Sequence, residues 1–296
     1  ENSAVYLRPE TAQGIFVNFE NVLRTMRAKL PFGIANIGKS FRNEITPGQF
    51  IFRTREFEQM EIEFFCKEED QEEWFNFWIN KRLDWYKSLG ISEDKLRIRT
   101  HEENELAHYA SKTSDIEFMY PWGWGELEGI ANRGTFDLTS HERESGKDLT
   151  YFDPESNEKI NPVVIEPAGG LTRTLFAILC SNYDEDTVND TTRTLFRFNF
   201  EIAPIQIAIL PLSKKDNLIN FSKEIKTKLQ KSFRTEIDIT QSIGKRYRRQ
   251  DEIGTPYCIT VDFETIDDDS VTIRNRDTMN QERVEINKLH DYFKNI

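Results

Sequence analysis

The sequence predicts two domains, an α+β domain built on an antiparallel sheet over residues 1–202 and a small α/β domain over residues 203–296. In the first range, long segments alternate apolar and polar side chains, which is typical of antiparallel strands with one solvated or functional face. In the second range, short apolar runs alternate with helical periods, which indicates an α/β arrangement. The charge changes at the same point, because residues 203–296 hold 16 Lys and Arg against 15 Asp and Glu, whereas residues 1–202 hold 23 against 36.

The first domain is expected to combine strands with two helices. Pro47 and Gly48 punctuate the connection between its first two strands. The first helix is expected to end at Gly90, a favoured residue at a helix C-terminus, and its stripe of Trp74, Phe77, Trp78 and Trp85 indicates core packing. The expected strands are 41–44, 50–65, 95–101, 115–131 and 135–141, and the expected helices are 71–90 and 170–183.

The second domain follows with an alternation of strand and helix periods. Two polar segments are expected to be surface loops, 184–193 in the first domain and 267–269 in the second. The expected strands are 205–212, 235–240, 257–263 and 270–276, and the expected helices are 216–233 and 281–296, with a basic segment at 244–250.

Composition narrows the class of protein. The chain has 296 residues and 38% hydrophobic content, enough for a sizeable core. No apolar run approaches the roughly 18–20 residues that cross a bilayer, so a cytoplasmic protein without membrane contact is expected. Cys66, Cys180 and Cys258 are widely spaced and the four histidines are scattered, so neither a disulfide framework nor a structural zinc site is expected.

The segment 50–65 has two unlike faces if it forms one strand. Its period of two places Phe50, Phe52, Met60, Ile62 and Phe64 on an apolar face, and Arg53, Arg55, Phe57, Gln59, Glu61 and Glu63 on the other. Guanidinium groups suit phosphate, an aromatic ring stacks on a purine, and a carboxylate holds an ammonium group. The second face is therefore interpreted as a site for a nucleotide beside an amine, with an exposed strand carrying cross-strand ion pairs as the alternative.

Several motifs in order resemble one family along nearly the whole chain. They are "RPETAQGIF" (8–16), "SFRNEITPGQFIFRTREFEQMEIEFF" (40–65), "WGELEGIANRGTFDLTSH" (124–141) and "EPAGGLTRTLFAIL" (166–179), followed by "APIQIAILPL" (203–212). "FRNE" with the later "REF" resembles motif 2 of class II aminoacyl-tRNA synthetases, and "GLTRTLFAIL" resembles motif 3. The set resembles the class II glycyl-tRNA synthetases of the homodimeric type, which implies a class II catalytic domain followed by an α/β anticodon-binding domain.

The resemblance implies an ATP site. Arg42 would contact the α-phosphate and Phe57 would stack on adenine. Arg173 would lie on the other side of the purine and reach the γ-phosphate, so Arg42 and Arg173 are the implied catalytic residues. Glu44 would contact the adenine amine, and Arg53 the polyphosphate.

The resemblance also implies a glycine site. Glu10, Glu61 and Glu166 would hold the ammonium group, and Arg133 the carboxylate. Glycine offers no side chain to bind, so its selection depends on its two charges and on the lack of room at the α-carbon. Ala168 stands where the family usually has serine, so one hydroxyl that would help to hold the amine is absent.

The implied reaction is the ligation of glycine to tRNA(Gly) through a glycyl-adenylate, with ATP as substrate and Mg²⁺. Phosphoryl chemistry of this kind depends on positioning and electrostatics and needs no enzyme nucleophile. Glu126 and Glu128 are candidate Mg²⁺ ligands, and cross-strand pairing beside Arg133 is the alternative for both.

In the second domain, "GKRYRRQ" groups Lys245, Arg246, Arg248 and Arg249 around Tyr247. Together with the anticodon-binding resemblance, this basic patch is expected to contact the tRNA backbone, and a solvated helix face is the alternative.

Motif 1, which forms the dimer interface of class II enzymes, is expected upstream of "RPETAQG", so a homodimer is expected for the full-length protein. Two other classes stay open. One is a non-catalytic synthetase-like protein that binds nucleic acid or assists a polymerase, which would have no reason to keep arginines and carboxylates around one pocket. The other is a class II synthetase for threonine, proline or histidine.

Overall fold

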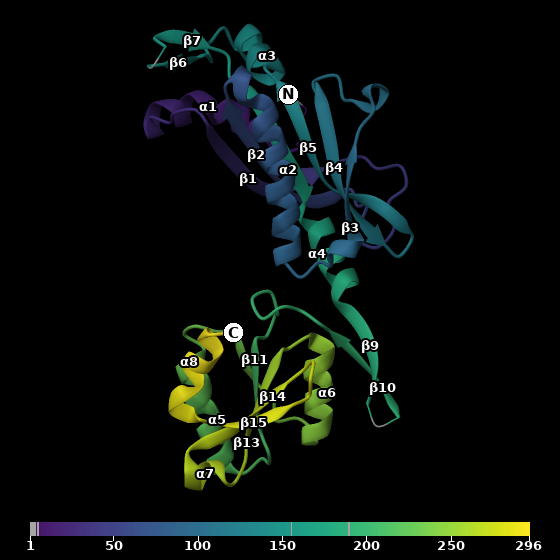
Figure 1. Cartoon of the computed structure of the whole chain (residues 1–296), viewed down its shortest axis with the longest axis vertical. Helices are drawn as coiled ribbons and strands as arrows, with labels where there is room; N and C mark the ends of the chain where they lie inside the picture. Colours follow the sequence, from purple (N-terminus) through teal and green to yellow (C-terminus); the bar gives the residue numbers. More distant parts are fainter. Residues whose placement is uncertain (1–3, 5, 155, 189) are drawn as a thin grey trace. The chain divides into compact units, whose positions relative to one another are not determined.

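A computed structural model describes residues 4, 6–154, 156–188 and 190–296 of the chain (Figure 1). The chain forms two compact units, Glu1–Ser181 and Asn182–Ile296, and each is described by itself. The division comes earlier than the boundary after residue 202 that the change of sequence period indicated. The reason is that Tyr183–Val188 and Thr191–Phe196 pair as antiparallel strands, and the second strand packs against a helix of the second unit.

The first unit is built on a six-stranded, fully antiparallel sheet, which confirms the predicted architecture of the first domain. Its strand order is β1-β2-β8-β5-β4-β3. A separate two-stranded hairpin, β6 (Tyr151–Asp153) with β7 (Glu158–Ile160), lies outside this sheet. The sheet strands are β1 (Phe32–Phe41), β2 (Glu56–Cys66), β3 (Leu96–Thr100), β4 (Lys112–Tyr120), β5 (Gly123–Gly134) and β8 (Val163–Gly170).

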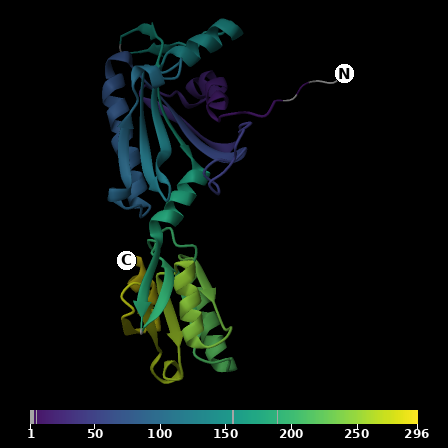
Figure 2. The same cartoon turned by 90° about the vertical axis from the view of Figure 1, so that its right-hand side faces the viewer.

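Helices cover the two faces of this sheet unequally. One face packs against α2 (Gln71–Ser88) and α4 (Leu171–Asn182) in a core that includes Phe64 and Ile165. The other face packs against α1 (Ala12–Met26) and α3 (Phe136–Ser145) at one end only. Figure 2 shows α1 and α2 on opposite sides of the sheet. The rest of the second face is left open for a site. In the described part of the chain, no helix is both long and apolar enough to span a bilayer.

The strand predicted over 50–65 begins only at Glu56, so the prediction was wrong for its first residues. Gln49 and Phe50 adopt positive φ angles of 55° and 56°, which turn the chain before it can pair. An isolated bridge between Gly48 and Arg53 closes this turn. Phe50 is consequently 72% exposed and does not lie on the apolar strand face.

The strand predicted over 135–141 is instead the start of helix α3. Gly134 has a φ of +56°, a left-handed conformation that glycine adopts without strain, and it ends β5. Arg133 then pairs with Asp137, four residues later, across this turn. The polar–apolar alternation of "TFDLTSH" was therefore misleading.

The second unit contains a five-stranded mixed sheet with helices, which confirms the predicted small α/β domain. Its strand order is β12-β11-β13-β14-β15, in which β11 pairs in parallel with β12 and β13 and the other pairs are antiparallel. The core gathers Ile207, Ile259 and Ile273 of the sheet with Leu218 of α5 and Phe293 of α8. The elements are β11 (Ile207–Pro211), α5 (Asp216–Leu229), β12 (Thr235–Ile237), α6 (Ile243–Ile253), β13 (Tyr257–Val261), α7 (Thr265–Asp268), β14 (Ser270–Asn275), β15 (Gln281–Glu285) and α8 (Leu289–Lys294).

Two predictions for residues that belong to the second unit were wrong. Most of the polar segment that was expected to be a loop before residue 193 lies in two paired strands, β9 (Tyr183–Val188) and β10 (Thr191–Phe196). The helix predicted over 281–296 is split, because residues 281–285 pair as an edge strand with β14 before α8 begins.

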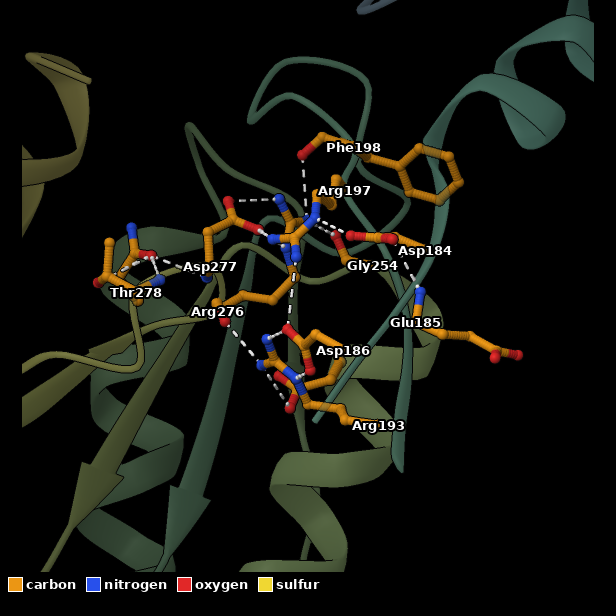
Figure 3. Close-up of polar contacts among 12 residues, drawn as sticks. Asp184, Glu185, Asp186, Arg193, Arg197, Phe198, Gly254, Arg276, Asp277 and Thr278 are labelled. Carbon is orange, nitrogen blue, oxygen red and sulfur yellow. Dashed lines mark hydrogen bonds and ion pairs between the residues drawn. The ribbon is translucent and has the colours of Figure 1, made fainter. Parts of the chain in front are cut away.

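A buried ion pair between Arg193 of β10 and Asp251 of α6 fastens the β9–β10 hairpin to the rest of its unit, and Arg193 also pairs with Asp186 inside the hairpin (Figure 3). Arg193 is only 1% exposed. Its guanidinium donates to Asp186 Oδ1 at 2.7 Å, to Asp251 Oδ2 at 3.3 Å and to the backbone carbonyl of Arg276 at 2.8 Å. Arg276 in turn donates to the carbonyl of Gly254 at 2.7 Å. A buried guanidinium with this many partners holds the hairpin firmly in place.

Candidate active site

A cavity of about 310 Å³ opens on the sheet face opposite α2 and α4. The period of two explains its composition, since Phe57, Gln59 and Glu61 of β2 project to the same side of the sheet. Residues of β8, β5, the 42–54 turn and the start of α4 complete the wall. From the sequence-predicted set, the lining residues are Glu10, Arg42, Glu44, Arg53, Phe57, Glu61, Glu126, Glu166, Ala168 and Arg173.

Cations and aromatic rings meet at one end of the cavity. The Arg42 guanidinium lies 5.2 Å from the centroid of the Phe57 ring, and its Nε donates to the carbonyl of Pro9 at 3.1 Å. Arg53 and Glu44 form an ion pair at 3.6 Å beside them. This end therefore offers positive charge next to an aromatic face, the combination that binds a nucleotide.

Arg173 connects the turn to the sheet. Its Nε donates to the carbonyl of Phe52 at 3.1 Å, and its guanidinium lies 4.3 Å from the centroid of the Phe52 ring. It also pairs with Glu126 at 3.3 Å. The aromatic partner of Arg173 in this structure is thus Phe52 of the turn, which sequence reasoning had assigned to the apolar face of a strand.

The opposite end of the cavity is acidic and closely organised. Glu61 is 3% exposed. Its Oε2 accepts from the backbone N–H of Thr11 at 2.7 Å and from the Thr11 hydroxyl, and its Oε1 accepts from Gln59 Nε2 at 2.5 Å. Burial raises the pKa of Glu61, against the hydrogen bonds from Thr11, which lower it. Glu10 is half-buried next to this group and accepts from Gln13 at 2.9 Å. Sequence reasoning missed the supporting contributions of Thr11 and Gln59.

Glu166 forms the back of the acidic end together with Arg133. Arg133 donates to both carboxylate oxygens of Asp137, at 2.7 and 2.9 Å, and to Glu166 Oε2, and its guanidinium lies 4.0 Å from the ring centroid of Tyr109. Burial raises the pKa of Glu166 to about 7, although Arg133 acts in the opposite direction.

The structure corrects one expectation for Arg133. This residue lies behind Glu166 and is absent from the cavity wall, where a partner of a substrate carboxylate was expected. The reason is that two buried carboxylates, Asp137 and Glu166, already take its donors. Ala168 does line the cavity as expected.

The two candidate Mg²⁺ ligands, Glu126 and Glu128, lie on opposite faces of the sheet. Glu126 lines the cavity and is half exposed. Glu128 faces the other side of the sheet, where it accepts from Arg82 at 2.6 and 2.9 Å and from the Tyr86 hydroxyl at 2.6 Å. The expectation for Glu128 was therefore wrong, because residues two positions apart on a strand share a face only where the strand is regular, and β5 has a bulge between Glu126 and Glu128, opposite Ile116 and Glu117. Over the described ranges, no cluster of three or more His, Cys, Asp or Glu side chains suits a metal ion.

The cavity wall also contains a pair that sequence reasoning missed. His101 Nε2 lies 2.8 Å from Asp115 Oδ2, and both residues line the cavity. Burial raises the pKa of Asp115, and the contact with His101 lowers it. The available signal was weak, since each residue merely stands at the end of an expected strand.

The basic segment of the second unit is the helix α6, and its cations are not equivalent. Lys245 is exposed, and Arg248 is half-buried. Arg249 pairs with Asp238. Arg246 is 3% exposed and donates to the backbone carbonyls of Pro211 at 2.7 Å and Asp238 at 3.0 Å. The expectation that Arg246 contacts a tRNA backbone was therefore wrong, because its guanidinium is used inside the unit.

One face of the antiparallel sheet carries a cavity with a cationic end suited to a nucleotide and an acidic end. This fold and this site are those of the class II aminoacyl-tRNA synthetases. Residues 1–182 match the tRNA synthetase class II core domain (G, H, P, S and T), and residues 206–296 match the Anticodon binding domain. The chain belongs to this class II synthetase family.

Similar curated proteins narrow the resemblance. The chain is 57% identical over 294 residues to a glycine–tRNA ligase of Ruminiclostridium cellulolyticum, 57% identical over 292 residues to one of Lachnospira eligens, and 55% identical over 288 residues to one of Bacillus cereus. These alignments cover 97–99% of this chain but only 62–63% of each relative. The chain therefore spans slightly less than two thirds of the proteins that it resembles.

Proposed function

We propose that the chain is the catalytic and anticodon-binding part of a glycine–tRNA ligase. It would join glycine to ATP as glycyl-adenylate and transfer glycine to tRNA(Gly), releasing AMP and pyrophosphate. The observation that carries this proposal is the arrangement of Glu10, Glu61 and Glu166 at one end of a cavity whose other end holds Arg42 and the Phe57 ring. The names of the similar proteins support the same activity.

In the proposed first step, the glycine carboxylate attacks the α-phosphorus of ATP and expels pyrophosphate. Arg42 neutralises charge on the transferring phosphoryl group, and Arg173 does so on the departing polyphosphate. Phe57 positions the adenine. Catalysis then rests on alignment and on preorganised positive charge, which is the usual basis of phosphoryl and nucleotidyl transfer. The terminal ribose hydroxyl of tRNA attacks the mixed anhydride in the second step.

Selection of glycine follows from the acidic end. An ammonium group would balance the clustered carboxylates, which are costly to hold together without a cation. Ala168 lines this end and leaves the position without a hydroxyl donor or acceptor. In this structure the Arg133 guanidinium contacts Glu166, so it acts on the glycine site through that carboxylate.

Mg²⁺ accompanies ATP in the proposed reaction and would neutralise charge on its phosphates. Glu126 fits this requirement because it faces the cavity and Mg²⁺ is commonly held by one or two carboxylates together with substrate phosphates. Glu128 does not fit, because Arg82 and Tyr86 occupy its carboxylate.

The proposal extends to tRNA, to assembly and to location. In the second unit, Lys245 and Arg248 are the cations of the basic segment that we assign to the tRNA backbone. We further propose a homodimer for the full-length protein and a cytoplasmic location, as for a translation enzyme. The alternative of a non-catalytic relative is not favoured, since the arginines and carboxylates that ATP and glycine require converge on one cavity and the similar proteins are named as ligases.

ATP–pyrophosphate exchange with a panel of amino acids, on the full-length protein and without tRNA, tests the proposal. Exchange that depends on glycine alone would support it. Exchange with threonine, proline or histidine would identify a different class II synthetase, and no exchange with any amino acid would favour the non-catalytic relative.

A further inference from the structure

Glu63 is a fully buried carboxyl group that the proposed reaction does not use. It is 0% exposed, and neither of its oxygens receives a hydrogen bond from an N–H or O–H group of the described residues. It follows Glu61 by two positions on β2 and shares its face. A buried carboxylate without a donor is costly, so this residue needs a physical explanation.

The strand register supplies the neighbour of Glu63. Glu61 pairs with Ala168 and Phe64 pairs with Ile165 in the β2–β8 ladder, which places Glu63 opposite Glu166. The side chains of Glu63 and Glu166 therefore lie next to each other on the same face of the sheet. Two carboxyl groups form a hydrogen bond only when one of them carries a proton.

The surrounding charges decide which group holds the proton. Glu61 on β2 and Glu166 on β8 face Glu63 with negative charge, and Arg133 on β5 is the facing cation, already bound by Asp137 of α3. Burial, followed by the charge of Glu166, raises the pKa of Glu63 well above its ordinary value. Glu166 is the better acceptor because Arg133 stabilises its charged form.

We propose that Glu63 is a positioning residue that stays protonated and donates its O–H to Glu166, holding that carboxylate in place for the substrate amine. Arg133 binds Oε2 of Glu166, so the two partners clamp Glu166 from behind while it faces the cavity. The proton also removes one negative charge from the cluster that Glu63 forms with Glu10, Glu61 and Glu166. This inference rests on the proposed function, since it assigns the amine to Glu166.

Two substitutions in the full-length protein test whether Glu63 acts as a neutral hydrogen-bond donor. Glu63→Gln keeps a neutral donor of the same length, whereas Glu63→Met keeps the volume and loses the donor. Glu58→Gln is the matched control, because Glu58 lies on the same strand, is exposed and belongs to the opposite face. The measurements are kcat and KM for glycine and KM for ATP in pyrophosphate exchange, as functions of pH.

Glu63→Gln should keep KM for glycine within about twofold, while Glu63→Met should raise it about tenfold or more, the effect of losing one hydrogen bond to a charged group. KM for ATP should not change in either variant. The acid limb of kcat/KM should move to higher pH only in Glu63→Met, because Glu166 loses the bond that favours its ionised form. Equal losses in Glu63→Gln and Glu63→Met, or no change in Glu63→Met, would overturn the proposal.

An infrared measurement tests the proton without relying on glycine. The protein should show the C=O stretching band of a protonated carboxyl group at about pH 8, where ordinary carboxyl groups are ionised. The band should disappear in Glu63→Gln and persist in Glu58→Gln. Its absence from the unsubstituted protein would refute the assignment, even if Glu63→Met does not fold. If the band is present but no glycine-dependent exchange occurs, the proposed function fails while the protonation of Glu63 stands.

Discussion

Replacement of Arg246 by Ala is expected to lower the free energy of unfolding of the second unit without removing a tRNA contact. The guanidinium donates two hydrogen bonds to backbone carbonyls, those of Pro211 and Asp238, at 2.7 and 3.0 Å. Hydrogen bonds from a charged donor contribute about 1.5–3 kcal/mol each. The substitution also removes the desolvation cost of the buried guanidinium, which offsets part of the lost stabilisation. A loss of about 2–4 kcal/mol in the free energy of unfolding is therefore expected.

Urea denaturation followed by circular dichroism measures this loss. With an m-value of about 2 kcal/mol/M, the midpoint of the transition that reports the second unit should fall by about 1–2 M. Lys245→Ala is the control, because Lys245 is exposed on the same helix and should leave the midpoint unchanged while weakening salt-dependent tRNA binding. The reasoning would be refuted by an Arg246→Ala protein with the original midpoint and weakened tRNA binding.

Three further predictions concern the first unit. Arg42→Ala and Arg173→Ala should each lower ATP–pyrophosphate exchange by about 100-fold or more at unchanged circular dichroism, and near-normal exchange would contradict their placement against the phosphates. Glu128→Gln should lower the free energy of unfolding by about 2–4 kcal/mol, because Arg82 loses a buried ionised partner, and should leave the Mg²⁺ concentration for half-maximal exchange unchanged; a shift in that concentration would restore Glu128 as a ligand. Burial raises the pKa of Glu166 to about 7, so its charge is lost as the pH falls through this value, and KM for glycine should rise between about pH 8 and 6, whereas a flat profile would argue against Glu166 as the amine partner.

The face of β2 was predictable because the period of two is a local property. Phe57 and Glu61 occupy the cavity wall where the alternation placed them. The turn before β2 was not predictable in the same way, since Gln49 and Phe50 adopt positive φ angles that neither residue type signals. As a result, the ring beside Arg173 is that of Phe52, which belongs to this turn and not to a strand, although it packs against the apolar core as the alternation predicted.

The partners of the buried arginines lay beyond sequence reasoning for a different reason. Arg133 and Arg246 each stand in a motif that suggests an external ligand. In the fold, however, each donates hydrogen bonds to groups of other elements of the protein. Which acceptor binds a guanidinium depends on the distances between separate elements, such as β5, β8 and α3. Residue type and spacing identify the donors, whereas only the tertiary structure identifies which of them remain available.

The ion pairs of Arg193 affect where a fragment that contains the second unit should begin. A fragment that begins at residue 206, where the match to the anticodon-binding family begins, would discard the hairpin and leave Asp251 with Arg274 but without Arg193. The Phe198 carbonyl that Arg276 binds would be lost as well. The compact unit that keeps these contacts together begins at Asn182, upstream of residue 206.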